Sequence, residues 1–250
     1  MRGLGAFCIC VIFAASLWGG IGRAGQSAEA FAWRGRLEPG KTLLLRNLNG
    51  PIVVEAAAGD EAEVTAGVGF EKSSPKDIRF EQRTDARGVQ ICAAWPGQAS
   101  CFDGAGGKVA DNDLQVTFRV KLPRGAGLDA GTVNGELAVR GVAGAARLAT
   151  VNGGVEVGAA AAPLTVGTVN GSIHARLVGL AGVGDLHFAT VNGDVNVQLP
   201  AHADAEVAAR TVSGTISILG TSYREKARTT LGKGGRQLSA QTVNGSIAFR

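Results

Sequence analysis

The stretch ATVNGGVEVG, residues 149–158, contains a tetrapeptide that recurs through the second half of the chain. TVNG occurs five times, and a near copy, TVSG, begins at Thr211; the six starts are Thr132, Thr150, Thr168, Thr190, Thr211 and Thr242. The steps between successive starts are 18, 18, 22, 21 and 31 residues. Self-similarity at such a period predicts a β-solenoid, in which each turn, or rung, is one unit stacked on its neighbours.

Apolar and polar residues alternate on both sides of the motif, which is the pattern of a strand with one buried face. After the motif, Leu137 and Val139 share one parity, whereas before it Leu164 and Val166 share the parity of Thr168. A shift of one residue exchanges the two faces of a strand, so the chain must bend at each motif. We therefore expect TVNG to be a corner whose Val fills the interior and whose Asn and Gly tolerate a positive φ.

The corners are the structural site that the sequence predicts. Their third and fourth residues are Asn134, Gly135, Asn152, Gly153, Asn170, Gly171, Asn192, Gly193, Ser213, Gly214, Asn244 and Gly245. Stacking lets the Asn and Thr side chains hydrogen-bond between rungs. The corner valines are expected to form one internal column, so that Val169→Asp should cost several kcal/mol; these are Val133, Val151, Val169, Val191, Val212 and Val243.

The regions before the repeats divide into two. Residues 1–30 are predicted to be a secretory signal peptide, since an apolar stretch follows Arg2 and small residues precede a cleavage site after Ala30. The alternative is a retained membrane anchor, because the apolar run is nearly long enough to span a bilayer. Cys8 and Cys10 lie in this segment without the preceding small residue of a lipoprotein, and no later segment is long and apolar enough to cross. Residues 31–128 are expected to be an irregular β-strand region and residues 129–250 the repeat solenoid, in one domain.

Charge and histidine placement give little sign of chemistry. The formal charge is +4, and no basic run is interleaved with aromatic residues, which argues against nucleic-acid binding. The histidines, His174, His187 and His202, are scattered and predicted to lie on the surface. We expect no catalytic set, no metal site and no cofactor.

Outward-facing charges and one polar loop are weaker signals. The acids Glu136, Glu156 and Asp194 are expected at corresponding positions, where a stacked stripe could bind a cation or a sugar. The interspersed Arg140, Arg176 and Arg250 favour charge compensation between rungs instead. The sequence ADNDL, residues 110–114, resembles a calcium loop only loosely and favours a polar turn.

Two cysteines remain after the predicted signal peptide, Cys92 and Cys101. An exported chain meets an oxidising compartment, so the pair is predicted to form an intramolecular disulfide. The Pro96-Gly97 turn could bring Cys101 back beside Cys92. A zinc site is the rival interpretation, but two thiolates without a nearby histidine would leave the ion half-coordinated.

The stretch VQICAAWPGQASCFDGAGGKVADNDLQVTFRVKLPRGAGLDAGTVNGEL, residues 89–137, followed by repeated V-N-G-x-[IVL] units, resembles the bacterial putative-adhesin family of β-strand repeat proteins. The resemblance extends from about Leu43 to Arg250. It implies a β-helix-like, right-handed all-β solenoid, export to the periplasm or cell surface, and no established catalytic residues.

Two classes of function remain open. The first is an exported, non-enzymatic cell-envelope protein, an adhesin or binding scaffold that presents a repetitive surface to a protein or glycan partner. The second is a β-helix carbohydrate-active enzyme, a polysaccharide lyase or hydrolase. The second class needs aromatic platforms and clustered acids, whereas Tyr223 is the only tyrosine and both Trp33 and Trp95 precede the repeats. The sequence therefore favours the first class and predicts no enzyme.

Overall fold

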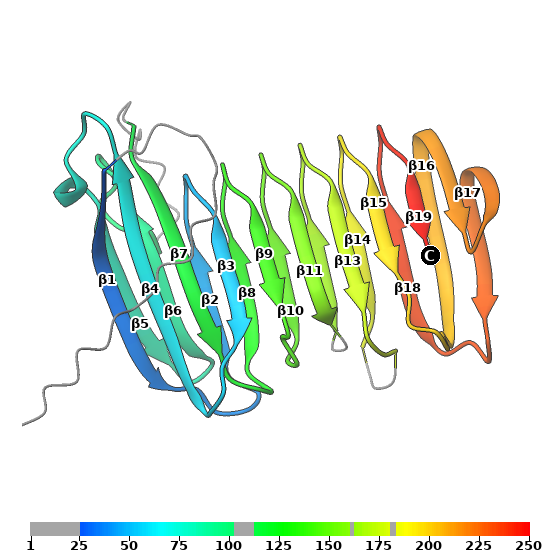
Figure 1. Cartoon of the computed structure of the whole chain (residues 1–250), viewed down its shortest axis with the longest axis horizontal. Helices are drawn as coiled ribbons and strands as arrows, with labels where there is room; N and C mark the ends of the chain where they lie inside the picture. Colours follow the sequence, from blue (N-terminus) through cyan, green and yellow to red (C-terminus); the bar gives the residue numbers. More distant parts are fainter. Residues whose placement is uncertain (1–25, 103–112, 161–162, 181–183) are drawn as a thin grey trace, which may run out of the picture.

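A computed structural model describes residues 26–102, 113–160, 163–180 and 184–250. These residues form an all-β solenoid, which confirms the predicted fold class (Figure 1). Their helical content is one short 3₁₀ turn, η1 (Pro75–Asp77), and none of their helices is long and apolar enough to span a membrane. The handedness of the coil stays a prediction from the resemblance.

The strands follow one another with few long connections. They are β1 (Gln26–Arg36), β2 (Thr42–Arg46), β3 (Ile52–Ala56), β4 (Glu61–Phe70), β5 (Arg79–Asp85), β6 (Gly88–Ala94), β7 (Gln115–Leu122), β8 (Gly127–Gly131), β9 (Leu137–Arg140), β10 (Ala146–Ala149), β11 (Val155–Ala160), β12 (Leu164–Gly167), β13 (Ile173–Leu177), β14 (Leu186–Ala189), β15 (Val195–Gln198), β16 (Ala205–Ile218), β17 (Thr221–Leu231), β18 (Arg236–Gln241) and β19 (Ile247–Phe249).

The strands build two faces that enclose the core. In face A the neighbouring strands are β5, β6, β2, β8, β10, β12, β14, β18 and the first half of β16. In face B they are β1, β4, β7, β3, β9, β11, β13, β15, β19 and the second half of β16. Each central rung contributes one strand to each face, and the motif joins the two strands at one edge. The strands of successive central rungs are parallel, as stacked coils require (Figure 1).

Both ends depart from chain order. The last rung in sequence, β18 and β19, lies between the rung of β14 and β15 and the long strand β16. At the other end β6 and β7 stack outside β2 and β3, which precede them in the chain. The outermost strands β1, β5 and β17 pair antiparallel with their neighbours and form the two ends of the stack (Figure 1). Charged side chains on such edge strands oppose end-to-end pairing of molecules.

The core is a narrow layer between the two faces. Strand residues alternate between buried and outward positions, as in β13, where Ile173, Ala175 and Leu177 are buried. Most core side chains are aliphatic, and three phenylalanines, Phe118, Phe188 and Phe249, are fully buried on different rungs. Small and β-branched side chains suit such a layer because opposite faces must pack at the same distance in every rung.

Each corner hydrogen-bonds to the corner before it. The Thr hydroxyl is buried and donates to the Gly carbonyl of the previous rung, as Thr168 does to Gly153 at 2.9 Å. The Asn side chains form an amide ladder along the exposed edge, running Asn49, Asn134, Asn152, Asn170, Asn192 and Asn244, with each Nδ2 donating to the preceding Oδ1 at 2.7–2.9 Å. The predicted hydrogen bonds of Asn and Thr side chains between rungs are therefore present: Asn bonds to Asn, and Thr bonds to a Gly carbonyl.

The prediction that the corner valines are internal is wrong. Val151, Val169 and Val191 are 38–39% exposed and Val212 is 67% exposed. Thr continues the inner face of the arriving strand, and the next inward side chain comes only after four corner residues, as at Leu137 after Thr132. The change of parity is real, but the corner residues between the two strands turn outward rather than filling the bend.

The roles of Asn and Gly at the corner also differ from each other. No corner Asn has a positive φ; its role is the amide ladder. Gly is required because a side chain there would strike the rung below: a Cβ on Gly193 would lie 2.1 Å from the carbonyl oxygen of Gly171. Close approach of the backbones, rather than the turn alone, therefore selects glycine.

The predicted signal peptide lies mostly outside the described residues, as do Cys8 and Cys10. Its last five residues, 26–30, belong to β1, which pairs with β4. Cleavage after Ala30 would leave Phe31–Arg36 of this strand in register with Glu61–Ala66. The first complete rung, β2 and β3, is built from residues before 129 and stacks directly on β8 and β9.

Candidate binding surface

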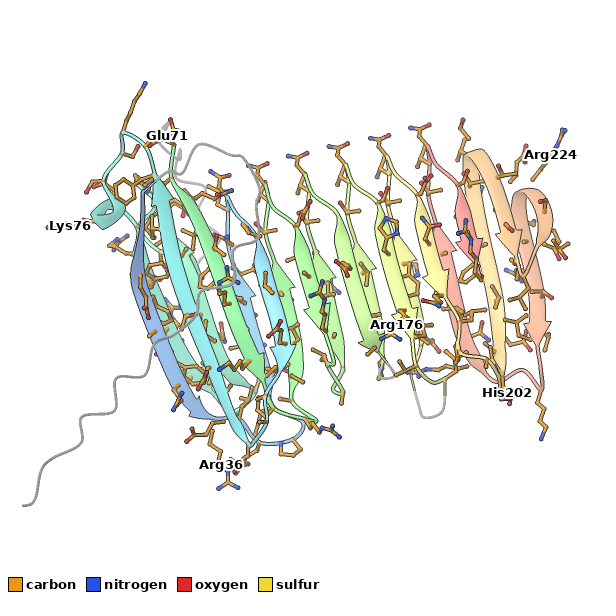
Figure 2. All side chains as sticks on the ribbon, in the orientation of Figure 1. Arg36, Glu71, Lys76, Arg176, His202 and Arg224 are labelled. Atoms are coloured by element: carbon orange, nitrogen blue, oxygen red, sulfur yellow. A yellow bond between two sulfur atoms is a disulfide. The ribbon has the colours of Figure 1, made fainter. Side chains whose placement is uncertain are left out.

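The three histidines lie apart from one another. His174 is exposed on β13 in face B, and His202 lies in the loop after β15, at the edge labelled in Figure 2. His187 is on β14 in face A, where its Nδ1 and the hydroxyl of Ser239 are 2.8 Å apart. The structure therefore does not bring the predicted surface histidines together.

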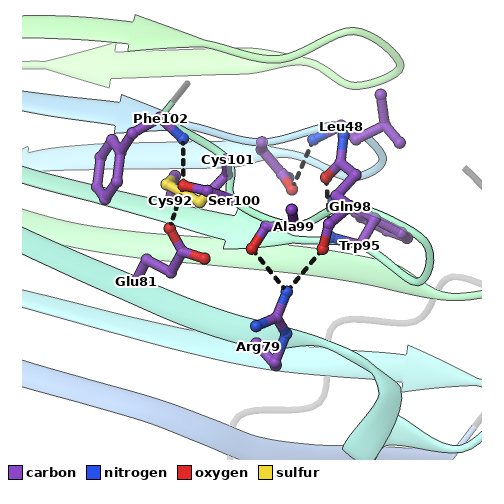
Figure 3. The surroundings of a disulfide bond; sticks show 11 residues. Leu48, Arg79, Glu81, Cys92, Trp95, Gln98, Ala99, Ser100, Cys101 and Phe102 are labelled. Atoms are coloured by element: carbon purple, nitrogen blue, oxygen red, sulfur yellow. Dashed lines mark hydrogen bonds between the residues drawn. A yellow bond between two sulfur atoms is a disulfide. The ribbon is translucent and has the colours of Figure 1, made fainter. Parts of the chain in front are cut away.

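The disulfide between Cys92 and Cys101 is present, as predicted. Cys92 is buried on β6, and the chain turns at Pro96 to bring Cys101 back with a Cα–Cα distance of 6.1 Å (Figure 3). Among the described residues, the metal-binding geometry found is Glu81 with these two cysteines, whose sulfur atoms are joined to each other. A bonded pair offers no thiolate to a metal ion.

The turn held by the disulfide also contacts β5. The guanidinium of Arg79 donates to the carbonyl oxygens of Gln98 and Ala99, at 2.7 and 3.2 Å. The hydroxyl of Ser100 donates to Glu81 at 2.7 Å (Figure 3). These contacts tie residues 98–101 to the edge strand of face A, so the disulfide has a structural role.

Removing the disulfide should destabilise the protein. We expect the double variant Cys92→Ala/Cys101→Ala to lose about 2–3 kcal/mol of unfolding free energy, because a short closed loop no longer restricts the unfolded chain. Urea denaturation without reductant measures the difference, and thiol titration of the wild type serves as the control. Equal midpoints for the two proteins would show that the bridge does not contribute to stability.

Asp113 is the acid of the ADNDL sequence that lies among the described residues, and it holds the loop after β4. Its carboxylate accepts the backbone N–H groups of Glu71 and Lys72 at 2.8 and 2.6 Å and of Ser73 at 2.9 Å. Hydrogen bonding with Ser73 and these backbone groups lowers the pKa of Asp113. A lowered pKa means that the ionised form is favoured in the folded state, and this contribution is lost as the pH falls through the folded-state pKa. The carboxylate is therefore occupied in holding the chain after β4.

The expected stripe of corresponding acids is not formed. Asp194 lies four residues after Thr190 and Glu136 four after Thr132, but Glu156 lies six after Thr150. Glu156 instead accepts a hydrogen bond from Arg140 on the adjacent rung at 3.3 Å. Charge compensation between rungs is thus present at this pair. Arg176 and Arg250 have no ion pair among the described residues.

A shallow hollow of about 450 Å³ lies over these positions on the outer side of face B. Parallel pairing aligns His174 with Asn196 and Arg176 with Gln198, so equivalent side chains of neighbouring rungs form two adjacent rows. The polar side chains that line the hollow are Glu156, His174, Arg176, Asn196, Gln198 and Arg250. Figure 2 shows Arg176 projecting from the middle of the stack.

The hollow offers hydrogen-bond donors and acceptors on a rigid support. Its side chains stand on β11, β13, β15 and β19, whose inner residues Val157, Ala175, Val197 and Phe249 are buried in the core. Guanidinium and amide groups can recognise carboxylates, hydroxyls and peptide carbonyls. The surface is therefore suited to binding. Sequence reasoning missed it because it considered the outward positions of each rung separately.

The fold is supported by comparison with one solved structure. A solved structure described as a putative cell adhesion protein from Clostridium sporogenes matches with a TM-score of 0.51 and 13% identity, over 89% of this chain and 99% of that one. Another, a putative adhesin from Bacteroides fragilis, matches with a TM-score of 0.33 and 9% identity, over 92% of this chain and 100% of that one. No curated protein is significantly similar in sequence. The model of the family described as Toastrack DUF4097 matches residues 107–250, more than half of the chain, and the protein therefore belongs to that family.

Proposed function

We propose that the protein is an exported, non-enzymatic binding scaffold of the cell envelope, with an adhesin-like role. The hollow on face B carries this proposal, because it combines a row of outward polar side chains with strands that are fixed by the core. Its partner is a protein or a glycan. The description of the Clostridium sporogenes structure as a putative cell adhesion protein agrees with this role, but at 13% identity the argument depends on the surface itself.

Export is supported by two features of the chain. The N-terminal segment has the composition of a signal peptide. The disulfide between Cys92 and Cys101 suits an oxidising compartment such as the periplasm or the cell surface.

The alternative, a carbohydrate-active enzyme, has less support. Such a site needs a general acid and a base or nucleophile at close range. In the face B hollow, the carboxylate is that of Glu156, and it is engaged by Arg140.

A surface variant tests the binding role. We expect Arg176→Ala/Asn196→Ala to weaken binding of an envelope partner at least about tenfold, because both residues line the hollow on its two middle strands, β13 and β15. Full-length protein would be screened on a glycan array and by pull-down from envelope extract, and each hit would be titrated with purified components. The control Arg147→Gln removes a charge from face A and should leave the affinity unchanged. Equal affinities for the wild type and the hollow variant would contradict the proposal.

A further inference from the structure

The net charge of the protein is concentrated at one end. Residues 199–250 contain seven Lys and Arg residues against three Asp and Glu residues. The other 198 residues contain eighteen of each kind, so the C-terminal segment supplies the whole excess of +4. This segment forms β16 to β19, the C-terminal end of the stack, from which Arg224 projects in Figure 2. A field of one sign at one end of a rod attracts ligands of the opposite sign.

Three of these cations surround a hollow on face A. Its volume is about 300 Å³, and it lies on the outer side of β16, β17 and β18. Ala208 is level with Ser239 on one side and with Arg228 on the other; in the next row, Arg210 lies between Gln241 and Lys226. The small side chain of Ala208 thus leaves a depression among longer side chains. The polar residues that line it are Arg210, Lys226, Arg228, Ser239 and Gln241.

Within the part of the chain that the structure describes, the three cations have no anionic partner. Among the described residues, neither Arg210, Lys226 nor Arg228 forms an ion pair or a side-chain hydrogen bond. Arg210 and Lys226 are directly opposite each other in the antiparallel pair β16–β17. Like charges in that position repel and destabilise the sheet. A bound anion would remove this repulsion.

The acids of the same segment do not line the hollow. Asp204 accepts the backbone N–H of Lys233 at 2.7 Å, and the carboxylate of Glu206 accepts the hydroxyl of Thr230 at 3.1 Å. Glu225 lies where the register of β16 and β17 is interrupted. None of the three is among the residues around the hollow.

In a second hollow on face A, the charged side chains are paired within the protein. It lies near the N-terminal end and has a volume of about 570 Å³. There Arg87 pairs with Asp85 at 3.1 Å, and the ammonium group of Lys41 donates to the carbonyl oxygen of Ala86 at 2.7 Å. Its charges are used within the protein, whereas those of the C-terminal hollow are available to a ligand.

We propose that the hollow formed by Arg210, Lys226, Arg228, Ser239 and Gln241 binds an acidic sugar of a polysaccharide. Two guanidinium groups and one ammonium group supply charge-assisted hydrogen bonds to carboxylate or sulfate oxygens. Gln241 adds an amide that can bond a neighbouring hydroxyl. The site deepens the binding role proposed above by naming a ligand class, at a place distinct from the face B hollow.

The form of the site favours a glycan over a membrane or a nucleic acid. A hollow of about 300 Å³ suits a single sugar unit better than it suits an extended plane of charged groups. No aromatic residue lines it, so a base has no ring on which to stack. No large apolar side chain lines it either, so nothing would insert among lipid acyl chains.

The experiment is a titration of full-length protein with defined polymers. Polygalacturonate presents carboxylates, heparin presents sulfates, dextran is the neutral control, and vesicles of phosphatidylcholine with phosphatidylglycerol present lipid phosphates. We expect binding of at least one acidic glycan, weakening as the ionic strength rises, and no binding of dextran. The variant Arg210→Gln/Lys226→Gln/Arg228→Gln should bind that glycan at least about tenfold more weakly.

A matched control separates the hollow from net charge. Arg119→Gln/Arg124→Gln/Arg147→Gln removes the same three charges from exposed positions elsewhere and should change the affinity less than about twofold. Equal losses in the two triple variants would overturn the site, as would binding to the anionic vesicles alone or to no acidic glycan at all. If no acidic glycan binds at this hollow but an envelope partner still binds through face B, the sugar site is wrong and the proposed binding role is supported.

Discussion

Gly193→Ala is expected to lower the free energy of unfolding by about 3 kcal/mol, the upper part of the range for forced overpacking. The new Cβ would lie 2.1 Å from the carbonyl oxygen of Gly171 and 2.5 Å from its carbonyl carbon. Both are backbone atoms, so no side chain can rotate away. The two rungs would have to separate, which would lengthen the hydrogen bond from Thr190 to the Gly171 carbonyl, now 2.9 Å.

The control for this substitution is Gly167→Ala, at the end of β12. A Cβ there would have no atom within 4 Å, and the backbone is not in the left-handed region. We expect its unfolding free energy to lie within about 0.5 kcal/mol of the wild type. Chemical denaturation of the three proteins compares them. Similar midpoints for both variants would show that the rungs do not approach as closely as the corner requires.

Val166→Asp is expected to cost about 4 kcal/mol, because it leaves an uncompensated charge in the core. Val166 is fully buried on β12, between the rungs that carry Leu148 and Phe188. The same substitution three residues later, Val169→Asp, should cost less than about 1 kcal/mol because Val169 is 38% exposed at the corner.

Thermal unfolding of the two aspartate variants measures this contrast. Val166→Asp should fail to fold or melt far below the wild type, whereas Val169→Asp should melt within a few degrees of it. A reversed order would restore the internal valine column that the sequence predicted. The pair is informative because both variants carry the same new side chain and the same change in charge.

Period and parity were sufficient to predict the solenoid. The 18-residue steps and the alternation around Leu137 and Leu164 specify stacked strands that bend at TVNG. The alternation of apolar residues could not show whether the Val169 side chain is buried. It shows that the inner faces of the two strands differ in parity, but not how many residues turn outward between the strands. The buried member of the corner is Thr168, whose hydroxyl is satisfied by a carbonyl of the neighbouring rung.

The order of the terminal rungs could not be predicted from local patterns. The corner of Asn244 lies between those of Asn192 and Ser213, although Ser213 comes first in the chain. The long β16–β17 hairpin makes this order possible, and its position depends on pairing between segments distant in sequence. For the same reason, the sequence did not indicate the cations of the C-terminal hollow on face A. Arg210 and Lys226 meet only through the antiparallel register of that hairpin.

The disulfide was predictable for a different reason. Two cysteines follow the predicted signal peptide, so one pairing is available within the predicted mature chain, and the Pro96-Gly97 turn permits it. The polar side chains around Arg176 gave no such signal, since arginine, asparagine and glutamine at outward positions are common on any solvated sheet. Their significance comes from their alignment across neighbouring rungs.

We propose that the protein binds a ligand without transforming it. Native mass spectrometry of the full-length protein with oligogalacturonates of defined length tests this role directly. We expect a complex whose released oligosaccharide has the mass of the one added, and loss of the complex in Arg210→Gln/Lys226→Gln/Arg228→Gln. Absence of a complex with the wild type, or recovery of shortened or unsaturated products, would contradict it.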